Sequence, residues 1–147
     1  MPHFGLIDDS LGPVEYAMQR ARLHIRSGKR RLRQGKISAG IVTLYDAVVY
    51  AFDWYIASPE RRSKLRIAEG EDLKDDNTVY EILKRSDVID SSFDYGLFNN
   101  LVEKSLEQEM PDYDYRDMLN SLESLMTRLG VMPFDENELP PEDPSTY

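Results

Sequence analysis

The segment that most constrains the fold is residues 38–57, which carry apolar side chains on two sides of a helix. Ile41, Leu44 and Phe52 belong to one side, whereas Val42 and Val49 belong to another. A helix that is apolar on two sides must be covered by neighbours on both of them. We therefore expect this segment to be the central, most buried helix of a bundle.

Apolar residues recur at helical spacing along the rest of the chain, and no segment shows the sustained alternation of a strand. A long helix is expected to begin at Pro13 and to end at Gly35. Its short connection to the central helix predicts an antiparallel hairpin. Three further helices are expected over residues 78–86, 91–110 and 112–129. The predicted fold is all-α, an up-and-down antiparallel bundle of four main helices plus a short extra helix.

Capping residues mark the expected helix ends, because side-chain oxygens and glycines satisfy the free backbone groups there. Ser38 is the predicted N-cap of the central helix, and Asn77 is that of the short helix. Ser91 or Ser92 is expected to open the next helix. Gly130 lies just past the expected end of the last one.

Composition indicates one domain followed by a tail. A chain of 147 residues with 41% hydrophobic content suffices for one core that buries about two thirds of the unfolded surface. We assign residues 1–130 to a single helical-bundle domain. Residues 131–147 form an acidic C-terminal tail that holds four prolines and is expected to be extended or disordered.

No contact with a membrane is expected. Asp46 and Asp53 interrupt the longest apolar run, which falls short of the roughly 20 residues of a membrane span. The first ten residues lack the basic and apolar parts of a signal peptide. The absence of cysteine excludes disulfides and thiolate metal sites and suits a reducing compartment. We therefore expect a cytoplasmic protein.

Charge divides the chain into a basic half and an acidic half. Residues 1–66 hold 12 Lys and Arg against 6 Asp and Glu, whereas residues 67–147 hold 6 against 21. Eight of the cations fall between Arg20 and Lys36, towards the end of the first helix, where the helix dipole favours them. The candidate contacts for a partner or an anion are Arg22, Arg26, Lys29, Arg30, Arg31, Arg33 and Lys36.

The basic cluster leaves several partners open. An acidic protein partner or the chain's own acidic tail is favoured. Nucleic acid is possible but disfavoured, because a net charge of −9 would repel the same polyanion. Within the bundle, the antiparallel register is expected to bring Asp46 and Asp53 within reach of the basic helix near Arg22, Arg26 and Lys29.

Two aromatic residues of the central helix, Tyr50 and Trp54, are candidates for a dimer or partner interface, because they lie one turn apart beside carboxylates. A place in the core or at its boundary is the alternative. His24 is interpreted as a partly exposed helix histidine without a catalytic partner. Glu103 and Glu107 are expected to lie on a solvated acidic face. No catalytic residue, cofactor or metal site is predicted.

The start of the central helix combines a Gly-Lys pair with small residues. Gly35-Lys36 comes first, Ala39 follows, and the run Tyr45-Asp46-Ala47 lies farther along the helix. Together with the predicted hairpin, this pattern resembles the HEPN family of small helical bundles. The resemblance covers roughly residues 13–129.

Active members of that family are similar to metal-independent ribonucleases that use an arginine and, a few residues later, a histidine near the start of the last helix. Arg116 stands in a plausible position, but no histidine follows it, since His3 and His24 both lie near the N-terminus. The resemblance therefore implies the non-catalytic branch, which looks like nucleotide-binding, nucleotidyltransferase-partner or antitoxin-associated bundles.

The sequence favours a non-catalytic protein-interaction module that forms a homodimer or binds a protein partner, because wide apolar stripes occur without catalytic chemistry. The alternative is nucleotide or RNA binding through the basic first helix, as the resemblance implies. An enzyme ranks last, since no catalytic motif occurs.

Overall fold

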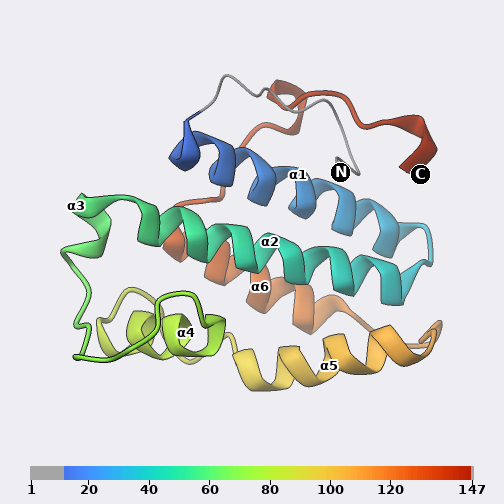
Figure 1. Cartoon of the computed structure of the whole chain (residues 1–147). Helices are drawn as coiled ribbons and strands as arrows, with labels where there is room; N and C mark the ends of the chain where they lie inside the picture. The colour runs from blue at the N-terminus through green and yellow to red at the C-terminus, as the bar shows by residue number, and fades with distance from the viewer. Residues whose placement is uncertain (1–11, 147) are drawn as a thin grey trace.

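The computed structural model describes residues 12–146, which form an all-α fold (Figure 1). The all-α prediction is confirmed for this part of the chain. None of its helices has both the length and the apolarity needed to cross a membrane. The helices are α1 (Pro13–Arg33), α2 (Ile37–Ala57), α3 (Pro59–Arg62), α4 (Asp76–Arg85), α5 (Tyr95–Glu107) and α6 (Arg116–Leu129), with the 3₁₀ helices η1 (Glu136–Glu138) and η2 (Pro144–Thr146).

α1 and α2 form the antiparallel hairpin that their short connection predicts (Figure 1). Gly35 turns the chain in a left-handed conformation with a φ of 80°, which glycine adopts without strain. Along the hairpin, Gly28 of α1 meets Gly40 of α2. A Cβ at Gly40 would lie 2.8 Å from Cδ2 of Leu32 and 3.1 Å from the backbone oxygen of Gly28. The two glycines therefore let the helix backbones approach closely.

α2 is the central helix, since it lies between α1 and α5 and packs on α6 behind it in the view of Figure 1. Its residues Ile41, Leu44 and Val48 are fully buried in the core. The second predicted apolar side is covered less completely, because Val42 and Val49 are half-buried and line open hollows. The pattern therefore predicted the position of the helix better than the extent of its burial.

Aspartates cap α4 and α5 instead of the predicted residues. Asp75, not Asn77, is the N-cap of α4, and its carboxylate accepts a hydrogen bond from a backbone N–H of the first turn. Asp94 caps α5 in the same way, so neither Ser91 nor Ser92 opens that helix. Several cap-forming residues stand side by side in both loops, and packing of the following helix decides which of them is used.

The predicted cap of α2 is also wrong, whereas the predicted end of α6 is confirmed. Ser38 lies inside the first turn of α2, and its hydroxyl donates to the backbone oxygen of Gln108 at 2.7 Å. This bond ties α2 to the loop after α5. Gly130 ends α6 in a left-handed conformation with a φ of 96°.

An ion pair holds the acidic loop before α4. Arg85 of α4 donates to both carboxylate oxygens of Glu71, at 2.8 and 2.9 Å, and also to the backbone oxygen of Arg66. The hydrogen bonds from Arg85, with a further one from the backbone of Ala68, lower the pKa of Glu71 to about 2. The loop is thus bound to α4 by a bidentate pair.

The Glu71–Arg85 pair predicts a pH-dependent contribution to stability. A carboxyl whose pKa is lower in the folded chain stabilises it above the unfolded value of 4.5, and this contribution is lost as pH falls towards about 2. We expect Glu71→Gln to be less stable than the parent at pH 7 and to lose most of this deficit at pH 2, as measured by urea unfolding. Glu69→Gln, a change at a neighbouring exposed residue, is the control. A deficit of Glu71→Gln that persisted at pH 2 would contradict the assignment.

The C-terminal tail lies along α1 (Figure 1). Val131 is fully buried in the core, and Phe134 packs against the core from outside. The guanidinium carbon of Arg22 lies 5.4 Å from the centroid of the Phe134 ring. The tail therefore starts as part of the packed bundle and continues over the surface of the basic helix.

Candidate functional site

Three arginines of α1 contact the tail. Nε of Arg22 donates to the backbone oxygen of Val131 at 3.0 Å. Arg26 donates to two backbone oxygens farther along the tail, at 3.3 and 2.6 Å. Arg30 forms an ion pair with Glu142 at 3.0 Å. The sequence left several partners open for these three arginines. In the structure, the chain's own acidic tail contacts them.

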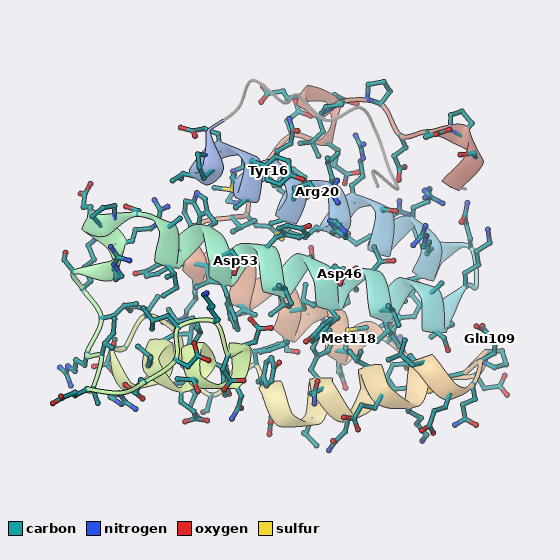
Figure 2. All side chains as sticks on the ribbon, viewed as in Figure 1. Tyr16, Arg20, Asp46, Asp53, Glu109 and Met118 are labelled. Atoms are coloured by element: carbon teal, nitrogen blue, oxygen red, sulfur yellow. The ribbon has the colours of Figure 1, made fainter. Side chains whose placement is uncertain are left out.

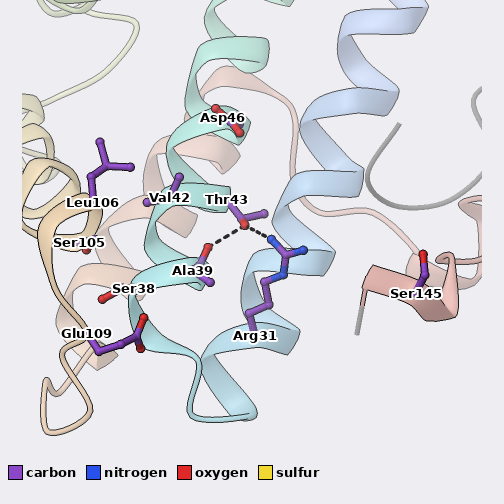
Figure 3. A pocket seen from close by; sticks show the side chains of 10 residues that line it. All are labelled: Arg31, Ser38, Ala39, Val42, Thr43, Asp46, Ser105, Leu106, Glu109 and Ser145. Atoms are coloured by element: carbon purple, nitrogen blue, oxygen red, sulfur yellow. Dashed lines mark hydrogen bonds between the residues drawn. The ribbon is translucent and has the colours of Figure 1, made fainter. Parts of the chain in front are cut away.

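The other candidate cations have different surroundings. Lys29 forms an ion pair with Glu123 of α6 at 3.2 Å. Arg31 turns towards α2 and donates to the hydroxyl of Thr43 (Figure 3). Burial and the neighbouring Arg30 charge lower the pKa of Arg31. Arg33 and Lys36 are exposed at the end of the hairpin.

The two aspartates that were predicted to face these cations lie in different surroundings. Asp46 does face α1, where its Oδ2 lies 3.9 Å from Nε2 of His24 (Figure 2). Asp53 lines a hollow beside α4 together with Asp76. Burial and the Asp53 charge raise the pKa of Asp76. The prediction for Asp53 was wrong, because Asp53 is exposed on the side of α2 that borders the hollow beside α4 and does not face the arginines of α1.

His24 is buried, with 2% of its surface exposed, so the prediction of a partly exposed histidine was wrong. Its Nδ1 lies 2.7 Å from the backbone oxygen of Arg20 and therefore carries a hydrogen. The ring lies beside Tyr50, with centroids 5.3 Å apart. Ala17, Arg20 and Ser27 are buried at the same helical spacing as His24, and this second stripe was the signal in the sequence. The arrangement holds α1 against α2.

The two candidate interface residues on α2 are half-buried and contact their own chain. The guanidinium carbon of Arg61 lies 3.7 Å from the centroid of the Trp54 ring, and its Nη2 donates to the Trp54 backbone oxygen at 2.7 Å. The ring of Tyr50 faces α1, where the guanidinium carbon of Arg20 is 5.3 Å from its centroid. Both rings thus have cations as intramolecular neighbours.

A polar hollow of about 560 Å³ opens between α2 and the end of α5 (Figure 3). Its hydroxyl groups are engaged in the fold: Thr43 donates to the backbone oxygen of Ala39, and Ser105 donates to that of Leu101. These bonds stabilise the helices that line the hollow. The remaining lining residues are Arg31, Ser38, Val42, Asp46, Leu106, Glu109 and Ser145.

An apolar groove of about 480 Å³ lies between α5 and α6, and sequence analysis did not identify it. Phe93 and Phe98 are buried and form its floor. Leu97 stands beside them with 68% of its surface exposed. Leu97 follows the helical spacing of the apolar residues of α5, but within residues 12–146 no element covers that side of the helix. The groove is also lined by Leu101, Tyr113, Met118, Ser92 and Ser121.

The rim of the groove is acidic. Asp94 and Asp117 line it, and neither forms an ion pair within residues 12–146. Burial, and after it the charges of Asp114 and Asp117, raise the pKa of Tyr113 in the groove wall. Arg116, the residue singled out by the family resemblance, is exposed and pairs with Asp114 at 2.6 Å. The groove thus combines apolar surface with a negative edge.

Comparisons with protein-family models, curated proteins and solved structures gave no match for this chain. In the part that the structure describes, no three His, Cys, Asp or Glu side chains gather where they could hold a metal ion. The arrangement of the surface residues is therefore the basis for a functional assignment.

Proposed function

We propose that this protein is a non-catalytic protein-interaction module, built on an up-and-down bundle of α1, α2, α5 and α6. The observation that carries the proposal is the apolar groove between α5 and α6. Leu97 is 68% exposed directly beside the buried rings of Phe93 and Phe98. The rings of the floor are already shielded, but Leu97 is exposed and the groove walls at Leu101, Tyr113 and Met118 are only half-buried. A bound partner would remove this apolar surface from water, which favours binding.

The occupant that fits the groove is an amphipathic helical segment with basic flanks. A helix offers apolar side chains one turn apart, which suits a groove whose two walls are themselves helices. Asp94 and Asp117 at the rim favour Lys or Arg on either side of those apolar residues. A second copy fits less well, since an isologous contact through this groove would bring its acidic rims together.

The other functions considered from the sequence have weaker support. Nucleotide or RNA binding through α1 would use Arg22, Arg26 and Arg30, which contact the tail. A homodimer through Tyr50 and Trp54 would use rings that pack against Arg20 and Arg61. Membership of the non-catalytic HEPN branch and a cytoplasmic location remain our proposals on the sequence features given above.

The proposal predicts that Leu97 matters for binding and Leu106 does not. These leucines lie on the same helix with 68% and 69% of their surfaces exposed, but only Leu97 lines the groove. We expect a labelled amphipathic Leu–Lys peptide to bind the parent, and Leu97→Glu to weaken binding by tenfold or more, since a buried carboxylate would replace an apolar contact. Leu106→Glu should leave the affinity within about twofold. Fluorescence anisotropy measures all three.

Two results would contradict this function. Equal effects of Leu97→Glu and Leu106→Glu would mean that the peptide binds the acidic surface in general and not the groove. If a Leu–Glu peptide of the same spacing bound as tightly as the Leu–Lys peptide, the acidic rim would not select basic flanks, and that part of the proposal would be wrong. Light scattering on the same samples tests the remaining occupant, because a dimer of 17.0 kDa chains that Leu97→Glu dissociates would assign the groove to a second copy.

A further inference from the structure

Arg22, Arg26 and Arg30 recur at four-residue steps on one side of α1, and we refer to them as the arginine ladder. All three donate hydrogen bonds to the chain's own tail, in which Pro140 and Glu142 lie in the non-helical stretch between η1 and η2. Arg22 and Arg26 bind backbone oxygens, which every peptide offers. Arg30 binds a carboxylate through Nε and Nη2, at distances of 3.0 to 3.2 Å. Arg26 and Arg30 therefore contact a non-helical stretch of chain that carries an acidic residue at a defined place.

The spacing of the ladder matches that of an extended peptide. Arg26 and Arg30 are separated by four helical residues, which rise about 6 Å along the axis. Their acceptors, the backbone oxygen of Pro140 and the carboxylate of Glu142, are two residues apart. Two residues of extended chain span about 6.5 Å. The chain and the helix thus stay in register between these two contacts.

Prolines help the tail to present its acceptors. Pro140 and Pro141 fix φ and have no backbone N–H, so they cannot continue η1, and Pro144, four residues after Pro140, has no N–H to offer the Pro140 oxygen in a helix. The oxygen of Pro140 accepts from Arg26 at 2.6 Å, the shortest contact of the ladder. An extended, proline-containing acidic segment is the chemistry that the ladder fits.

The tail is anchored at its start and held by polar contacts farther on. Val131 is fully buried, and Phe134 packs against the core. Residues 135–138 are exposed, as are residues 143–145. Between them, Glu142 and Arg30 form an ion pair in which the side chains are 9% and 12% exposed. The segment 135–145, which we call the distal tail, can therefore leave the ladder without removing the core contacts of residues 131–134.

We propose that the arginine ladder is a docking site for an extended acidic segment of a partner protein, and that the distal tail is its built-in competitor. The distal tail is tethered beside the ladder at an effective concentration on the order of millimolar. A partner segment must therefore offer more contacts than the tail does. The acidic half of the chain, with 6 Lys and Arg against 21 Asp and Glu, disfavours a nucleic acid as the occupant. This site is separate from the α5–α6 groove and does not depend on it.

The experiment uses a fluorescent peptide with the sequence of residues 134–145 and the full-length protein. We expect weak binding to the parent, because the distal tail occupies the ladder. Glu142→Gln removes the charge of the Arg30 contact from the protein's own tail, and we expect it to bind the peptide about tenfold more tightly. Glu136→Gln is the matched control, since it removes one charge from an exposed position of the same segment and should leave the affinity as in the parent.

Adding Arg30→Ala to Glu142→Gln should return binding to the level of the parent or below, because the ladder then lacks its carboxylate contact. Equal affinities of the parent, Glu142→Gln and Glu136→Gln would overturn the proposal, as would binding that survives Arg30→Ala. A short oligothymidylate is tested in parallel. If Glu142→Gln bound the oligonucleotide through Arg30 and did not bind the peptide, the site would belong to a nucleic acid and the proposed partner would be wrong.

Discussion

Gly40→Val is expected to lower the free energy of unfolding by about 3 kcal/mol. A Cβ at this position would already lie 2.8 and 2.9 Å from two side-chain carbons of Leu32, and 3.1 Å from the backbone oxygen of Gly28. Valine adds two methyl groups to that contact. Because a backbone oxygen of the neighbouring helix is involved, α1 and α2 must move apart, and the core along the hairpin loses packing. Urea unfolding followed by circular dichroism measures the loss.

Gly96→Val is the control for this change. Gly96 lies in the first turn of α5, where a Cβ would meet only a carboxylate oxygen of Asp94 at 3.4 Å, an ordinary contact. The same substitution there should change the free energy of unfolding by no more than about 0.5 kcal/mol. If both variants were equally stable, the close approach of α1 and α2 would not exist in solution.

Tyr80→Ala is expected to destabilise the fold by about 3 to 5 kcal/mol. The Tyr80 ring lies between α4 and α5 with its centroid 5.6 Å from that of Tyr95 and 6.3 Å from that of Phe93. Its hydroxyl donates to the backbone oxygen of Phe93 at 2.6 Å, and the residue is buried. Removing the ring leaves a cavity in the aromatic cluster and a backbone oxygen without its donor.

Tyr80→Phe separates these two effects. The ring remains, but the buried oxygen of Phe93 loses its donor, so we expect a loss of about 1 to 3 kcal/mol. Thermal and urea unfolding of the two variants, compared with the parent, give the difference. Equal losses for phenylalanine and alanine would mean that the hydrogen bond alone joins α4 to α5, contrary to the ring packing described above.

The sequence predicted the helices well because a helix is determined by nearby residues. The spacing of apolar residues along residues 13–33 and 37–57 specifies two helices, and Gly35 between them specifies the turn. Gly130 ended the last helix for the same local reason. The N-caps of α4 and α5 were less predictable, since each loop offers several side chains that can accept the same backbone hydrogen bond.

The surfaces were harder to predict, because spacing says which residues share a side of a helix and not what covers it. Leu97 follows the apolar spacing of α5 but is exposed. His24 lies outside the predicted apolar stripe of the first helix and is nevertheless buried. The charge division of the chain made an internal partner for the basic cluster plausible. It did not say that Arg22 and Arg26 would bind backbone oxygens of the tail, which carry no signal in the sequence.

By itself, the sequence determined that this chain folds as an all-α protein whose second long helix is central, because helical periodicity depends on residue type and spacing, and a helix that is apolar on two sides needs neighbours on both. The tertiary structure decided where the tail lies and which apolar residues stay uncovered. Both depend on how α5, α6 and the tail pack against the hairpin, and that packing joins residues more than 100 positions apart, such as Arg30 and Glu142. Local patterns contain no information about such pairs. The groove and the contacts of the arginine ladder could therefore be identified only from the tertiary structure.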